Sequence, residues 1–117
     1  MKYMLLIYLG EGWNKLSPEQ RQRVYWEQRE LTDPLTETGQ VLSGHPLHPP
    51  SAATSVRIRD GKPVLTDGPF AETREHLGGY ILIEAQNLDE ALALATRSPL
   101  ARVGTIEVRP VREGPPT

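Results

Sequence analysis

The chain of 117 residues contains no cysteine. This absence excludes disulfides, thiol nucleophiles and cysteine-ligated metals, and it suits a reducing compartment, so we expect a cytoplasmic protein. Histidine is scarce too, and His45, His48 and His76 are the three in the chain. Because His45 and His48 are three apart on a segment with strand character, their side chains should point to opposite faces. We therefore expect no bound metal.

An excess of charge of one sign is also lacking. The 13 basic and 15 acidic residues are interspersed and leave a net charge of −2, so we expect neither nucleic acid nor a membrane surface as a partner. The apolar run of residues 3–9 is too short to span a bilayer and lacks the cleavage site of a signal peptide. The pair Gly78-Gly79 is not followed by a helical pattern, so there is no phosphate-binding loop and we expect no cofactor.

The length suits one domain with a substantial core. We assign this domain to residues 1–111 and expect the tail, residues 112–117, to be disordered because it is rich in proline, glycine and charge. Residues 3–9 are apolar on both pleat faces, which predicts a central strand covered on two sides. The full set of expected strands is 3–9, 40–47, 54–59, 62–66, 80–85 and 105–111.

Two helices carry clear start signals. Ser17 as N-cap and Gln20 as its capping-box partner predict a helix over residues 18–38, in which Pro34 should cause a kink or a fresh turn. Asn87 predicts the start of a second helix, which ends at Ser98. The apolar stripe expected on this second helix consists of Leu88, Ala91, Leu92 and Ala95.

Asp60-Gly61 is the strongest hairpin signal in the chain, and it lies between the strands expected at 54–59 and 62–66. Alternation along the first strand predicts two unlike faces. Val56 and Ile58 form an apolar face, and Ser55, Arg57 and Arg59 form a polar, basic one.

The order strand, helix, strand, hairpin, strand, helix, strand predicts an α+β fold. It is a ferredoxin-like split βαβ arrangement with an inserted β-hairpin, and both helices should cover one face of an antiparallel sheet. The opposite face then has no helix to cover it. Since the strands at 3–9 and 80–85 are apolar on both sides, we expect a two-fold homodimer with the sheets face to face.

The turn that follows the hairpin is the main candidate site. An aspartate in a turn usually accepts a hydrogen bond from the N–H two residues on, but for Asp67 that residue is Pro69, which has no N–H. Gly68 permits the turn, Phe70 is the one phenylalanine of the chain, and Glu72 adds charge. These residues suit a cleft wall, although a Gly-Pro turn is also an ordinary way to leave a strand.

Other candidate ligand-binding residues are Arg57, Tyr80 and Glu107. Arg57 offers a planar fork for a carboxylate or phosphate, but it could equally form a structural ion pair with Asp67 across the hairpin base. His45 is either a general base in a cleft or an edge residue whose hydrogen bonds are satisfied.

Several segments in order carry a resemblance to a known family: residues 1–8, 54–57, 66–73, 78–80 and 106–111. Together they resemble the YCII-related family in its DGPF-domain branch. The resemblance implies a ferredoxin-like subunit of a dimeric α+β barrel with a cleft between the sheets. It also implies a link to transcription, because some members resemble companions of extracytoplasmic-function sigma factors.

The wider family includes a dehydrochlorinase of a hydroxylated aromatic compound, for which a His-Asp pair has been proposed. The histidine of that pair lies on the first helix of the wider family. The helix expected at 18–38 contains no histidine, so the pair is not carried over to this chain. Two functions stay open. One is a domain that binds a small ligand or assists a transcription regulator. The other is a cofactor-free lyase or isomerase that acts on a small anionic or phenolic substrate, with Asp67 as acid/base and Arg57 as anion clamp.

Overall fold

The computed structural model describes residues 1–69 and 71–116, so Phe70, expected in the wall of a cleft, lies outside the described residues. The elements in chain order are β1 (Lys2–Leu9), α1 (Glu11–Asn14), α2 (Pro18–Glu37), β2 (Val41–Pro46), the 3-10 turn η1 (Pro50–Ala52), β3 (Thr54–Arg59), β4 (Lys62–Asp67), β5 (His76–Glu84), α3 (Leu88–Arg97), α4 (Leu100–Val103) and β6 (Gly104–Pro110).

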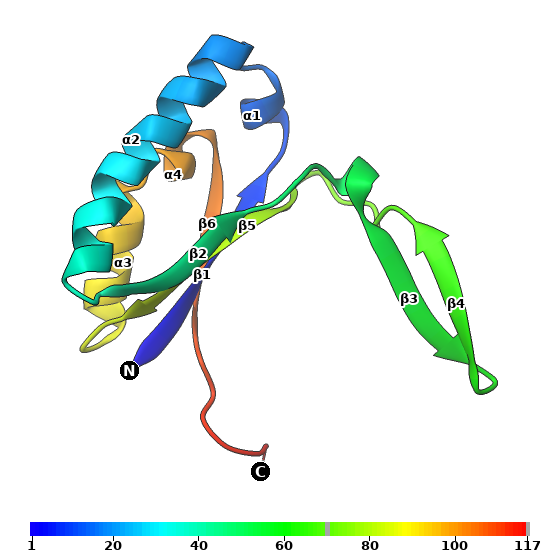
Figure 1. Cartoon of the computed structure of the whole chain (residues 1–117). Helices are drawn as coiled ribbons and strands as arrows, with labels where there is room; N and C mark the ends of the chain where they lie inside the picture. Colours follow the sequence, from blue (N-terminus) through cyan, green and yellow to red (C-terminus); the bar gives the residue numbers. More distant parts are fainter. Residues whose placement is uncertain (70, 117) are drawn as a thin grey trace.

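Four strands form one sheet in the order β2-β5-β1-β6, and all neighbouring strands are antiparallel. Helices α2 and α3 lie against one face of this sheet, and β3 and β4 form a separate two-stranded sheet that projects away from it (Figure 1). This is the predicted α+β, split βαβ arrangement with an inserted hairpin. Among the described residues no helix is long and apolar enough to cross a membrane.

The core lies between the sheet and the two helices. On β1, the residues Tyr3, Leu5, Ile7 and Leu9 are buried, and the residues between them are only half-buried. Each buried side chain of this kind contributes about 1.5–3 kcal/mol. The strand was expected to be covered on both faces, and within one chain only the helix-facing side is covered.

Local signals for α2 are confirmed. Ser17 accepts a hydrogen bond from the Gln20 N–H at 3.2 Å, and the Gln20 side chain accepts one from the Ser17 N–H at 2.8 Å. The helix ends where Gly39 takes a positive φ of 85°. The fresh turn expected at Pro34 is wrong, since α2 continues through it. Leu31 and Leu35 on either side of Pro34 pack against the core, and this contact keeps the helix in one piece.

Helix α3 buries a different side from the one that the sequence predicts. Its buried residues are Ala91, Leu94 and Ala95, whereas Leu88 and Leu92 are 46% and 44% exposed. Asn87 caps the helix as expected by accepting from the Glu90 N–H, but the Glu90 carboxylate accepts from Gln40 instead of closing a capping box. Contact with the sheet, together with this link to the start of β2, decides that α3 buries its narrow side with Ala91 and Ala95.

Smaller differences concern element bounds. Two short helices were not expected: α1 lies between β1 and α2, and α4 follows the end of α3. Strand β5 begins at His76 instead of Tyr80.

We call the hairpin of β3 and β4 the arm. Its turn residues Asp60 and Gly61 have φ angles of 52° and 76°, which is the two-residue turn that the sequence predicts. At its base the Gly68 N–H donates to the Ala53 carbonyl at 2.7 Å, and the Ser55 hydroxyl donates to the Gly68 carbonyl at 2.8 Å. The radius of gyration is 16.1 Å, whereas a compact chain of this length has about 13 Å. The arm accounts for the extended shape in Figure 1.

Replacing Ile83, which is fully buried, by alanine should lower the free energy of unfolding by about 2–5 kcal/mol, because it leaves a cavity between sheet and helices. Leu42→Ala is the control, since Leu42 is exposed and should cost less than about 1 kcal/mol. Urea unfolding followed by circular dichroism measures both values. Equal losses would contradict the position of the core.

Candidate functional site

The sheet face that carries no helix, here called the helix-free face, combines apolar and polar side chains. Strand alternation and register place on it Met4, Leu6 and Tyr8 of β1, His45 of β2, Tyr80 and Leu82 of β5, and Thr105, Glu107 and Arg109 of β6. Most of these side chains are half-buried and the others are exposed. A surface of this kind is neither a finished core nor an ordinary solvated face.

Three predicted site residues lie in one row across this face. His45 is directly opposite Tyr80, Tyr80 is opposite Leu6, and Leu6 is opposite Glu107. The rings of His45 and Tyr80 are 5.9 Å apart between centroids and inclined at 57°. At the far end, Arg109 donates through Nε to the Glu107 carboxylate at 2.5 Å. With strands about 4.8 Å apart, His45 and Glu107 are separated by about 14 Å, so the two side chains do not bond to each other directly.

Glycines hold β2 close to β5 at this row. A Cβ on Gly44 would lie 2.9 Å from the Tyr80 carbonyl oxygen, and a Cβ on Gly79 would lie 3.0 Å from the His45 carbonyl oxygen. The backbones can approach this closely only without side chains at these two positions. The approach sets the imidazole of His45 beside the Tyr80 ring.

The turn residues form a second, separate group. Asp67 is the last residue of β4 and lies opposite Thr54, whereas Arg57 lies opposite Val64. Since Thr54 and Arg57 are three apart on one strand, Asp67 and Arg57 point to opposite faces of the arm. The described residues contain no ion pair between them, and the expected acid/base Asp67 and anion clamp Arg57 do not share one face of the arm. Within the described part of the chain the Asp67 carboxylate has no hydrogen bond or ion pair.

The other turn residues lie at the base of the arm. Gly68 takes a positive φ of 90°, as the turn requires. Glu72 is exposed in a segment without helix or strand. None of the described turn residues is brought next to His45 by the pairing of the strands.

Two open hollows adjoin the arm. The first, of about 400 Å³, is mostly apolar and is lined by Leu47, His48, Pro49, Pro50, Ala52, Ala53, Pro69, His76 and Leu77. The second, of about 340 Å³, lies on the basic face and is lined by Ser55, Arg57, Arg59, Val64, Thr66 and Pro69. Asp67 lines neither hollow, so the predicted cleft beside Asp67 and Arg57 is not found in the described residues. No group of three or more potential metal ligands occurs among them either.

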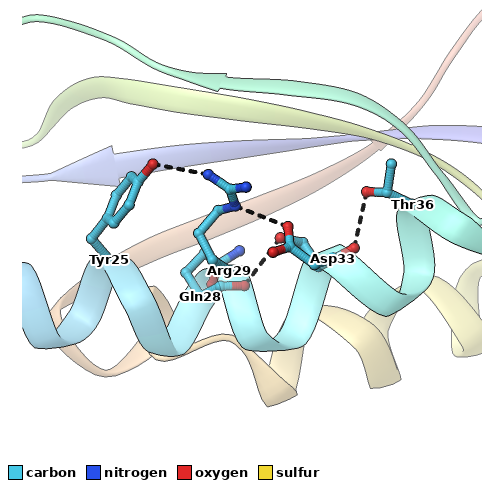
Figure 2. A network of polar contacts seen from close by, with 6 residues as sticks. Tyr25, Gln28, Arg29, Asp33 and Thr36 are labelled. Carbon is cyan, nitrogen blue, oxygen red and sulfur yellow. Dashed lines mark hydrogen bonds and ion pairs between the residues drawn. The ribbon is translucent and has the colours of Figure 1, made fainter.

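A polar network on α2 lies apart from both groups (Figure 2). Arg29 donates to Asp33 at 2.9 Å and to the Tyr25 hydroxyl at 3.0 Å, which joins three successive turns of the helix. The hydrogen bond to Asp33, and then that to Tyr25, raises the pKa of Arg29, so the guanidinium keeps its charge. Spacings of four residues are those of helix-stabilising pairs, and we assign the network to the helix and not to a site.

Comparison with known proteins agrees with the fold and the sequence pattern. The YCII-related domain matches residues 1–114, and the chain therefore belongs to the YCII-related domain family. An uncharacterised protein of Rhizobium meliloti strain 1021 is 36% identical over an alignment that covers 95% of this chain and 92% of the relative. The resemblance inferred from the sequence is thereby confirmed.

A solved structure shares the fold. It is 5-chloro-2-hydroxyhydroquinone dehydrochlorinase (TftG) from Burkholderia phenoliruptrix, in complex with 2,5-dihydroxybenzoquinone. Its TM-score is 0.58 at 16% sequence identity, over 97% of this chain and 96% of that one. At this identity the likeness concerns the fold alone.

The sequence analysis selected His45, Tyr80 and Glu107 separately, and the structure places the three in one row. What it missed is Leu6 at the centre of the row and the direct neighbourhood of the two rings. The registers of β1 on β5 and on β6 place Leu6 at the centre. The register of β2 on β5, which includes an irregularity between Val41 and Ser43, places His45 beside Tyr80. No local signal in the sequence reports that shift.

Gly44→Ala should displace β2 from β5, because the added Cβ would collide with the Tyr80 carbonyl at 2.9 Å. We expect a loss of about 1–3 kcal/mol in the free energy of unfolding and a shifted His45 ring resonance in NMR spectra. Ser43→Ala, on the same strand, is the control and should change neither. Unchanged His45 resonances in Gly44→Ala would contradict the close approach.

Proposed function

We propose that this chain binds a small planar organic molecule on the helix-free face, beside His45 and Tyr80, in a cleft closed by a second copy of the chain. The observation that carries the proposal is the row His45, Tyr80, Leu6 and Glu107, which combines an apolar centre with polar ends on an uncovered sheet face.

The chemistry of the row suits a ring with polar substituents. Leu6 offers an apolar floor, and the Tyr80 ring can stack on or against an aromatic ligand. The imidazole of His45 can donate or accept a hydrogen bond at one edge of the ligand, and the Glu107–Arg109 pair can do so at the other. An aliphatic ligand without polar edges would leave these groups without partners.

A second copy supplies what one chain lacks. Ligand sites bury about 70–90% of a small molecule, and one flat sheet covers a ring on a single side. Two helix-free faces related by a two-fold axis would enclose it and would bury the half-exposed side chains of β1 and β5 at the same time. This agrees with the homodimer expected from the sequence.

A second candidate function is cofactor-free proton transfer, as in a lyase or isomerase. The contact of His45 with Tyr80 favours it, since an imidazole beside a phenol can exchange protons with a bound ring. Asp67, the acid/base expected from the sequence, lies on the arm, so His45 replaces it in this proposal. The link to a sigma factor and the cytoplasmic location stay predictions.

Binding is tested with 2,5-dihydroxybenzoquinone and benzoate as probes, by calorimetry. The quinone is chosen because the dehydrochlorinase of like fold was solved with it. His45→Ala and Tyr80→Leu should each weaken the binding about tenfold, which corresponds to about 1.4 kcal/mol. His48→Ala is the control, because it alters a nearby histidine that is outside the row and should not affect binding.

Two results would overturn the binding site: no heat of binding for either probe, or an equal loss in His48→Ala. If the quinone is consumed, His45→Ala should lower the rate about 100-fold. An undiminished rate in that variant would exclude His45 as the acid/base.

Leu6→Glu should separate the proposed dimer, because it places a charge in the centre of the helix-free face. Leu88→Glu is the matched control, since Leu88 is exposed on α3, on the other side of the sheet. Analytical ultracentrifugation should find the parent and the control at twice the chain mass of 13.1 kDa and Leu6→Glu at that mass. A parent protein of 13.1 kDa at micromolar concentration would contradict the closed cleft.

A further inference from the structure

The arm exposes more apolar surface than a free hairpin tolerates. Val56, Ile58 and Leu65 are 62%, 60% and 67% exposed, and within the described chain no residue of the arm is buried. An isolated two-stranded hairpin is marginally stable in water. The arm therefore lacks the surface that would stabilise it.

The two faces of the arm differ in character. Register places Val56 and Leu65 opposite each other on one face, together with Ile58 opposite Pro63, and this is the apolar face. Arg57, Arg59 and Lys62 project on the other face. A hairpin that is solvated on both sides needs no such separation, whereas one that packs on a surface through one side does.

We propose that the apolar face of the arm packs against the second copy of this chain and holds the dimer together. The proposal rests on the two-fold dimer of the proposed function and adds a second contact to it. Figure 1 shows the arm on the side of the sheet away from the helices, which is the side that the second copy would occupy.

The size of the helix-free face supports this occupant. Four strands that are about 4.8 Å apart and about seven residues long outline about 450 Å². A stable interface buries about 800 Å² of accessible surface per partner, which is larger than this flat outline. The arm, with two strands of six residues, adds about 200 Å² in outline from each copy.

Neighbouring residues of β4 provide a matched test. Leu65→Lys places a charge on the apolar face, and Val64→Lys places the same charge on the basic face. Sedimentation equilibrium should give a dimer dissociation constant at least tenfold weaker for Leu65→Lys and within twofold of the parent for Val64→Lys. Neither residue belongs to the core, so circular dichroism should find both variants folded.

A second measurement reports on the arm directly. Because the chain has no cysteine, Arg59→Cys gives a single site for a spin label near the end of the arm. In the parent background, pulsed electron resonance should find one narrow distance between the two labels of a dimer, and in Leu65→Lys no such distance. A broad distribution in the parent, or equal dissociation constants for the two lysine variants, would overturn the proposal.

The outcomes separate this inference from the proposed function. Quinone binding that depends on His45, together with equal dissociation constants for both lysine variants, would overturn the arm contact and leave the binding site intact. Conversely, a dimer that Leu65→Lys weakens and Leu6→Glu does not would support the arm contact and remove the closed cleft. The inference would be overturned by a parent chain that is monomeric at all concentrations. It would also be overturned if the distribution of label distances became narrow only when another protein is bound.

Discussion

One-sided coverage of the sheet is the constraint from which the rest follows. Helices α2 and α3 bury alternate residues of β1 and β5, and the residues between them stay half-buried on the face without helices. Those residues are largely apolar, as Met4, Leu6 and Leu82 illustrate. An antiparallel sheet in water normally presents a polar outer face, so this chain carries surface suited to a ligand or to another protein.

The polar residues of the helix-free face lie at fixed positions within that largely apolar surface. His45 lies beside Tyr80 because two glycines let β2 approach β5, and Glu107 closes the other end of the same row with Arg109. These groups are fixed by sheet register and not by loops, which makes their spacing rigid. The turn with Asp67 has different properties, because it belongs to the arm and shares no row with them.

Local patterns predicted the elements, and long-range register decided the site. The cap at Ser17 and the turn at Asp60 depend on neighbours in sequence, and both were predictable. The buried side of α3 was not, because contact with the sheet chose Leu94 over Leu88. The separation of Asp67 from Arg57 could have been derived, since a two-residue turn fixes every pair of the hairpin. The place of His45 in the row depended on the shifted pairing near Val41, which no local signal reports.

The tight turn at Asp60 and Gly61 also limits how the arm can evolve. Both residues have positive φ and form a two-residue turn, which fixes the register of β3 on β4. Inserting a single residue into β4 just before Val64 would turn Leu65 to the side of the arginines and Val64 to the apolar side. Related chains should therefore change the length of this hairpin in steps of two residues, one in each strand, and should rarely gain or lose one alone.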